Sequence, residues 1–174
     1  MKAILVIIGS ASENSSNQKL VELLASLARN ELTFKIYTGL KSLPHFDPEL
    51  SVSDPPQEVL NLRREIEAAD GIIICTPEYV FSIPSGLKNA IEWCVSTTVF
   101  SDKPSGLITA SAQGEKAHEE LQLLMRTLMA QFTAKTTLLI PGIKGKLNEN
   151  GDITDFETRE KIQSFLEAFR GIVR

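Results

Sequence analysis

Five short runs of apolar residues recur along the chain, and each is followed by a segment whose apolar residues have helical spacing. The short runs are rich in isoleucine, leucine and valine, which is typical of parallel strands buried on both faces. The later segments have the pattern of amphipathic helices. The predicted strands cover residues 3–8, 34–37, 72–74, 107–110 and 138–140. The predicted helices lie at 20–27, 59–69, 85–95, 115–132 and 155–172.

This alternation predicts an α/β fold, a three-layer sandwich in which helices cover both faces of a five-stranded parallel sheet. Crossovers must be right-handed, and five strands fit the flavodoxin-like order 2-1-3-4-5. In that order ligands bind beyond the carboxyl ends of the first and third strands. We expect residues 1–174 to form a single domain, because no linker, repeat or low-complexity tract is visible.

Polar loops follow the first and third predicted strands, where the ligand crevice is expected. Residues 9–17 contain a glycine, four serines and two asparagines, and a helix follows them. Hydroxyls and free N–H groups at a helix N-terminus suit a phosphate, although an ordinary capped polar loop is the alternative. Residues 76–82 carry hydroxyl, carboxylate and aromatic groups, and a third loop of small residues covers 111–114. Neither GxGxxG nor GxxxxGK[ST] is present, so neither a Rossmann fingerprint nor a P-loop is supported.

These loops together suit a mononucleotide with a flat ring, such as a flavin. Backbone N–H groups can stabilise the negative charge that reduction places on a flavin ring, so no catalytic His or Cys is required. We therefore assign no catalytic side chain, since the flavin N5 carries the chemistry, and no metal ligand. The candidate cofactor-binding residues are Ser10, Ser12, Ser15, Ser16, Asn17, Pro77, Glu78, Tyr79, Val80, Phe81, Ser82, Ser111, Gln113 and Gly114.

Several side chains near these loops have a structural alternative. Glu78 either contacts the ligand or caps or pairs at the surface, and Tyr79 either contacts the ring or packs at the rim. Trp93 is expected in the core or at a dimer interface rather than stacked on a cofactor. Lys88 is expected to form a structural salt bridge or hydrogen bond.

Charge and cysteine usage narrow the function classes. The net charge is −4 and no basic patch is visible, which argues against a nucleic-acid partner or an acidic membrane surface. Cys75 and Cys94 form neither a CxxC pair nor a metal-ligand spacing, so we expect two buried thiols in a reducing cytoplasm. The apolar run at 3–9 is too short for a membrane span and lacks a signal-peptide cleavage site. We expect a cytoplasmic protein.

The fourth predicted helix is apolar around more than one face. Its apolar residues include Leu121, Leu123, Leu124, Met125, Leu128 and Met129. A helix of this kind usually packs on a partner as well as on its own core, so we interpret it as a dimer helix. A core helix is the alternative.

The chain resembles the NADPH-dependent FMN reductase family over about residues 3–140. The most specific matching block is PEY…SIP…LKNAI, from Pro77 to Ile91, and it continues to Trp93. Weaker matches are Gly9-Ser10 with Ser15 and Asn17, the pairs Leu43-Pro44 and Phe46-Asp47, and Pro56 with the helix to Ala69-Asp70.

The resemblance implies non-covalent FMN, with its phosphate in 10–17 and its ring against 77–82 and the loop after Ala110. It implies hydride transfer from NADPH or NADH and electron delivery to quinones, free flavins, metal ions or azo compounds. It also implies a homodimer or homotetramer formed through helices of the third and fourth units. A flavodoxin-like FMN-binding electron carrier or sensor without NAD(P)H turnover is the alternative function.

Three positions depart from the family pattern. Ser12 replaces a basic residue that usually faces the phosphate, which leaves neutral donors and a helix dipole worth about 0.3–2 kcal/mol. A scaffold that no longer binds FMN is therefore a further alternative. Val80 and Phe81 replace an asparagine and a small or polar residue, which makes the acceptor side more apolar. The glycine-rich loop after the fourth strand is reduced to Gly114.

Overall fold

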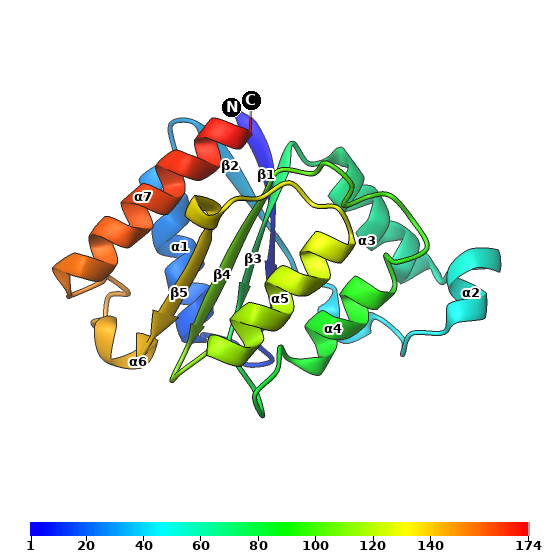
Figure 1. Ribbon diagram of the computed structural model, residues 1–174, viewed down its shortest axis with the longest axis horizontal. Coiled ribbons are helices and arrows are strands. Elements are labelled where there is room, and N and C mark those ends of the chain that lie inside the picture. Colours follow the sequence, from blue (N-terminus) through cyan, green and yellow to red (C-terminus); the bar gives the residue numbers. More distant parts are fainter. Residues whose placement is uncertain (174) are drawn as a thin grey trace.

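The computed structural model describes residues 1–173 and is built on a parallel sheet in the order β2-β1-β3-β4-β5 (Figure 1). The strands are β1 (Lys2–Ile8), β2 (Leu32–Tyr37), β3 (Gly71–Thr76), β4 (Ser105–Ser111) and β5 (Thr137–Pro141). The predicted fold class and strand order are confirmed. Because β1 and β3 are neighbours, their carboxyl ends meet at the middle of one sheet edge.

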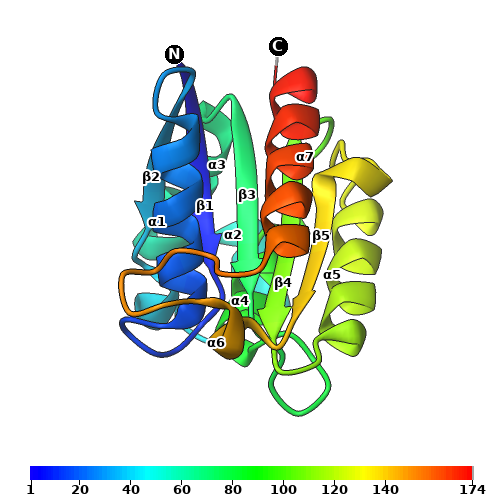
Figure 2. The same cartoon turned by 90° about the vertical axis from the view of Figure 1, so that its left-hand side faces the viewer.

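Helices cover both faces of the sheet (Figure 2). The helices are α1 (Ser16–Ala28), α2 (Pro48–Ser53), α3 (Gln57–Ala68), α4 (Ser85–Glu92), α5 (Glu115–Thr127), α6 (Ile143–Lys146) and α7 (Phe156–Ile172). Short 3-10 turns cover Leu40–Ser42 and Ala134–Thr136. α1 and α7 lie on one face, and α3, α4 and α5 lie on the other. Within residues 1–173, no helix is long and apolar enough to cross a membrane.

The central strand explains why the apolar runs are continuous. Every residue of β3 is buried, and successive side chains point to opposite faces. Ile73 and Cys75 pack with the side chains of α1 and α7, whereas Ile72 and Ile74 pack with those of α3, α4 and α5. A strand covered on both sides needs apolar residues at every position.

The long connection before α3 is more ordered than expected. The sequence patterns predicted no helix between residues 39 and 56, but this segment contains α2. Asp47 caps this helix, because its carboxylate accepts hydrogen bonds from the N–H groups of Glu49 (2.9 Å) and Leu50 (3.0 Å). α6 is a second helix that the sequence did not predict.

Two predicted helices end earlier than the apolar pattern suggested. α4 ends at Glu92, so Val95 leaves the apolar face and is 59% exposed. α5 ends at Thr127 because Gln131 pairs with another segment: its N–H donates to Lys103 O (3.0 Å) and its carbonyl accepts from Ser105 N–H (2.8 Å). Continued helix at Gln131 is incompatible with that pairing.

Two helices begin within one residue of their predicted starts. Asp155 caps α7, because its carboxylate accepts the Thr158 N–H at 3.2 Å. Pro84 occupies the N-cap position of α4, and Ser85 is the first helical residue.

Two blocks of the family motif meet in the fold. Trp93 is fully buried and donates its indole N–H to Pro44 O at 2.8 Å. Asn89 donates to the same carbonyl (2.9 Å) and accepts the N–H of Phe46 (2.8 Å). Phe46 also packs edge-on against Trp93, with ring centroids 5.4 Å apart. Trp93 is therefore a core residue that holds the long connection against α4. The predicted Lys88 salt bridge also forms, to Glu92 at 2.7 Å.

Candidate functional site

The loops after β1 and β3 converge at the carboxyl edge of the sheet. Gly9 N–H donates to Cys75 O at 2.9 Å, which continues the strand pairing into the first loop. A Cβ added at Gly9 would lie 2.4 Å from Thr76 Oγ1, so only glycine allows this approach. Farther out, the hydroxyls of Ser10 and Tyr79 lie 3.3 Å apart. The convergence predicted from the strand order is therefore present.

A cavity of about 730 Å³ opens between these loops, within the usual size of a cofactor site. Eight of the fourteen predicted residues line it: Ser10, Ser12, Ser15, Ser16, Asn17, Pro77, Tyr79 and Ser111. Other lining residues include Glu13, Asn14, Ala110, Ala112 and the segment 142–145. One wall is thus rich in hydroxyls at the start of α1, while proline, tyrosine and alanine side chains lie on another.

The first turn of α1 is held rigidly at this cavity. Ser15 caps the helix by accepting the Gln18 N–H at 3.1 Å. Asn17 is buried, and its amide donates to Ala110 O at 3.1 Å while its carbonyl accepts from the Cys75 thiol at 3.3 Å. Burial raises the pKa of the Cys75 thiol, which keeps the proton that it donates. Asn17 therefore fixes the helix, and its first two residues, Ser16 and Asn17, whose N–H groups precede the first intrahelical hydrogen bond, line the cavity.

Six predicted site residues lie outside the cavity lining: Glu78, Val80, Phe81, Ser82, Gln113 and Gly114. Glu78 points away from the cavity, toward the start of α5. Its carboxylate accepts from Ala117 N–H (2.9 Å) and Gly114 N–H (3.3 Å), while its own N–H donates to Ser111 Oγ at 3.1 Å. Glu78 thus joins the second loop to the third loop and caps α5, which has no cap of its own.

Replacing Glu78 with alanine should lower the free energy of unfolding by about 2 kcal/mol, because a charge-assisted cap and a favourable helix-dipole contact are lost. Urea unfolding measures the loss. Glu78→Gln keeps one acceptor oxygen without the charge and should lose less. Glu119→Ala is the control, since that exposed residue, within residues 1–173, pairs only with Lys116 on the same helix. Equal losses in Glu78→Ala and Glu119→Ala would contradict the capping role.

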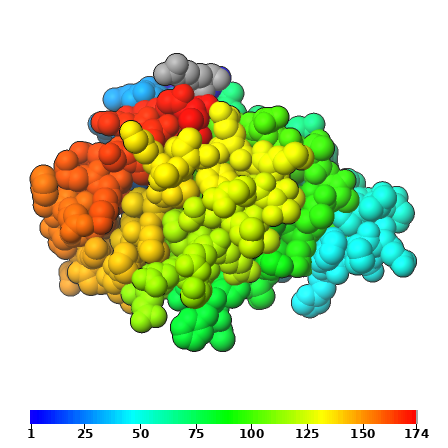
Figure 3. All heavy atoms as spheres, in the orientation of Figure 1, coloured from blue at the N-terminus to red at the C-terminus, as the bar shows by residue number. Residues whose placement is uncertain are grey.

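Residues 79–82 form a tight hairpin turn that projects from the cavity side of the molecule (Figures 1 and 3). Tyr79 N–H donates to Ser82 O at 2.9 Å, and Ser82 N–H donates to Tyr79 O at 3.1 Å. Val80 and Phe81 have φ of 51° and 59°, and they are 93% and 71% exposed. Left-handed φ at both central positions is the type I′ geometry that favours Asn-Gly, so a valine and a phenylalanine are strained there.

The base of the hairpin turn is fixed by a residue that the sequence did not single out. Glu120 of α5 accepts hydrogen bonds from the Ser82 hydroxyl (2.7 Å) and the Ile83 N–H (2.9 Å). Together with Glu78, it anchors the second loop to α5 from both ends. The strained tip therefore stands on a rigid base.

Lys144 and its neighbours were also missed, although they line the cavity. They belong to α6, which follows the edge strand β5 and turns back toward α1 (Figure 2). A four-residue helix has no periodicity that a sequence pattern could reveal. Among residues 1–173, no group of three His, Cys, Asp or Glu side chains is placed to hold a metal ion.

Comparisons with known proteins agree with this geometry. The sequence model of a family described as NADPH-dependent FMN reductase matches residues 2–144. A 2-hydroxy-1,4-benzoquinone reductase of a Burkholderia species is 30% identical, with 98% of this chain and 96% of that protein covered. Subunit CrdA of the NADH:(hydroxy)cinnamate reductase of Vibrio ruber is 31% identical, with coverages of 97% and 84%. The solved structure of FerB, a flavoenzyme NAD(P)H:(acceptor) oxidoreductase from Paracoccus denitrificans, has a TM-score of 0.80 at 27% identity, with coverages of 99% and 97%.

Proposed function

The chain belongs to the NADPH-dependent FMN reductase family, and we propose that it is an FMN-dependent reductase of small quinones. The family makes it an oxidoreductase that uses FMN and NADPH or NADH. In the proposed overall reaction, NAD(P)H, a proton and a quinone give NAD(P)⁺ and a hydroquinone. When bound, FMN supplies the two-electron relay between the two substrates.

The cavity fits FMN in size and in the chemistry of its walls. The hydroxyls of Ser10, Ser12, Ser15 and Ser16 and the first N–H groups of α1 would hold the phosphate. Pro77, Tyr79 and the start of the third loop at Ser111 would border the ring. Of the candidates outside the cavity lining, Val80, Phe81, Ser82, Gln113 and Gly114 belong to the loops that would border the ring, and Glu78 would act by holding those loops.

The protein's own side chains hold the second and third loops in place at the cavity before the reaction. Glu78 and Glu120 hold both ends of the second loop, so Pro77 and Tyr79 are in place at the cavity before a cofactor binds. Ser111 Oγ accepts the Glu78 N–H and links the second and third loops at the cavity wall. A loosened loop would lose this preorganisation even with the cofactor retained.

The acceptor class follows from the exposed hairpin tip. Val80 and Phe81 follow Tyr79, which lines the cavity, and expose apolar surface, which favours a flat apolar acceptor over a hydrated ion. A relative named as a benzoquinone reductase supports the same class. The convergence of a serine-rich helix N-terminus and the second loop on one cavity is the observation that carries the proposal. A steady-state assay with NADPH or NADH and a benzoquinone tests it, and no turnover with either nucleotide would contradict it.

We also propose a homodimer formed by the outer faces of α4 and α5, in the cytoplasm. Leu123 of α5 is 62% exposed, and Val95 beyond the end of α4 and Met129 beyond the end of α5 are 59% and 61% exposed. These three exposed side chains lie on or just beyond α4 and α5, on the side of the sheet that these helices cover. The thiols of Cys75 and Cys94 are buried and free, which suits a reducing compartment.

A charge at this surface should separate the dimer. Light scattering should give a mass near 38 kDa for the wild type, twice the chain mass of 19.2 kDa, and a lower mass for Leu123→Glu. Phe156→Glu is the control, because Phe156 is 72% exposed but begins α7 on the opposite face. A mass near 19 kDa for the wild type, or a mass that Leu123→Glu leaves unchanged, would contradict this interface.

A further inference from the structure

We propose that Lys144 is the cation that binds the FMN phosphate, in place of the basic residue missing at Ser12. This inference rests on the proposed function and adds a residue outside the three loops that the sequence assigned to the cofactor. Lys144 lines the same cavity as Ser12, Ser15 and Ser16. It is exposed, and it takes part in no ion pair among residues 1–173.

The start of α6 is fixed to the third loop. Gly142 N–H donates to Ala112 O at 3.1 Å, and Gly142 has φ of 67°, which glycine adopts without strain. Ala112 belongs to the loop that lines the cavity. The residues around Lys144 are therefore held beside the cavity wall.

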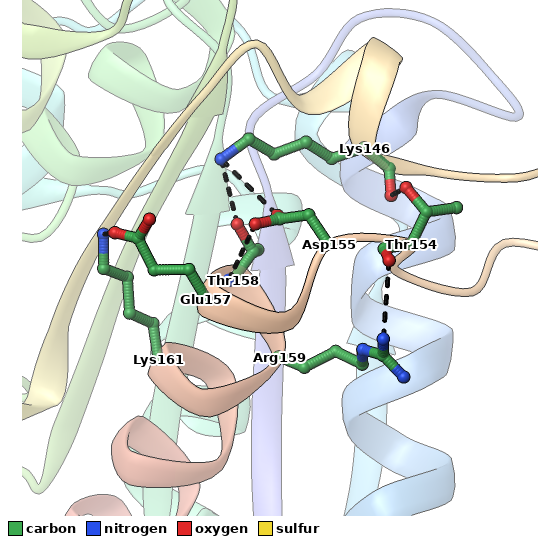
Figure 4. Close-up of polar contacts among 7 residues, drawn as sticks. All are labelled: Lys146, Thr154, Asp155, Glu157, Thr158, Arg159 and Lys161. Carbon is green, nitrogen blue, oxygen red and sulfur yellow. Dashed lines mark hydrogen bonds and ion pairs between the residues drawn. The ribbon is translucent and has the colours of Figure 1, made fainter.

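The end of α6 is fixed to α7 by the neighbouring lysine (Figure 4). Lys146 Nζ donates to Thr158 Oγ1 at 2.9 Å and lies 3.7 Å from Asp155 Oδ2. The backbone is held as well, since Thr154 N–H donates to Lys146 O at 2.8 Å. The side chain of Lys146 is thus held at the start of α7.

This anchoring assigns different directions to the two lysines of α6. Residues two apart on a helix point about 200° from each other, since each residue turns the helix by about 100°. Because Lys146 points to α7, Lys144 points to the opposite side, where the cavity lies. In this fold, Lys146 therefore contacts α7, and Lys144 lies at the cavity that the serine-rich loop of residues 10–17 also lines.

The charged side chains near the cavity indicate how Lys144 would contribute to phosphate binding. Glu13 also lines the cavity, and its exposed carboxylate lies 3.7 Å from Lys41 Nζ, which offsets part of its negative charge. Lys144 is the one lysine or arginine among the described residues that line this cavity, and the other groups there suited to a phosphate dianion are neutral hydroxyls and the N-terminus of α1. A charge-assisted contact from Lys144 would then raise FMN affinity by about 10- to 100-fold.

The test is the dissociation constant of FMN, measured from the flavin fluorescence released when the holoprotein is diluted. Lys144→Ala should raise this constant about 10- to 100-fold. Lys144→Arg keeps the positive charge and should leave the constant near the wild-type value. The wild-type constant should rise with salt, and Lys144→Ala should weaken that dependence. Lys135→Ala is the matched control, since Lys135 is also exposed but lies before β5, at the other edge of the sheet.

Riboflavin separates a phosphate contact from a structural role, because it lacks the phosphate. The wild type and Lys144→Ala should bind riboflavin equally, and adding Ser12→Arg to Lys144→Ala should recover FMN affinity. An FMN constant within twofold of the wild type, or equal weakening of FMN and riboflavin, would overturn the role of Lys144. A wild type that binds neither flavin would instead overturn the proposed function.

Discussion

Replacing Val80 with asparagine and Phe81 with glycine is expected to raise the free energy of unfolding by about 1–3 kcal/mol. The gain comes from relieving two left-handed residues, of which a β-branched valine is the more strained. Little burial is lost, because both side chains are mostly exposed. Asn-Gly is the pair that this turn geometry favours, so the hairpin should form more readily. Urea unfolding at fixed protein concentration measures the change.

The same double variant should lose acceptor binding. With its apolar tip removed, we expect a higher KM for a benzoquinone at an unchanged KM for the pyridine nucleotide. Asp102→Gly is the control, because Asp102 also has a positive φ, 56°, but lies in the turn before β4, at the opposite edge of the sheet. It should gain some stability without a kinetic effect. A less stable double variant, or one with unaltered quinone KM, would show that the strain serves no acceptor site.

Replacing Trp93 with alanine is expected to lower the free energy of unfolding by about 3–5 kcal/mol. The indole is fully buried, and its removal leaves a cavity and weakens the tie to Pro44 O. Such a loss is a large part of a typical domain's stability. Because Trp93 is the only tryptophan, far-UV circular dichroism should follow the urea unfolding in place of fluorescence.

Two further variants define what Trp93 contributes. Trp93→Phe keeps an aromatic ring in the core and should lose less than Trp93→Ala. Phe156→Ala removes a mostly exposed ring and should change the stability by no more than about 0.5 kcal/mol. A loss below about 1 kcal/mol for Trp93→Ala would mean that the contact between α4 and the long connection is not a structural support.

The sheet, and the ligand crevice at the carboxyl ends of β1 and β3, could be predicted because they depend on patterns within the sequence. Each strand buried on both faces needs an unbroken apolar run, as in β3, and the strand order then places the first two loops together. The serine-rich start of α1 is also visible as composition. Thus the cavity wall formed by residues 10–17 could be predicted from the sequence.

The remaining parts of the site depend on contacts between distant segments. Lys144 reaches the cavity only because α6 turns back from the edge strand, and nothing in its local sequence indicates this. Glu78 could be assigned to α5 only after the start of that helix was placed beside it. The left-handed Val80 and Phe81 oppose their own backbone preferences, so no turn signal marks them.

The most direct test of the proposed function is the visible absorbance of the purified protein, recorded without oxygen before and after NADPH or NADH is added. We predict a flavin band that bleaches with at least one nucleotide and returns when a benzoquinone is added. That result would show both bound cofactor and electron transfer to the acceptor class. A band that persists with both nucleotides, or no band after incubation with FMN, would contradict the account.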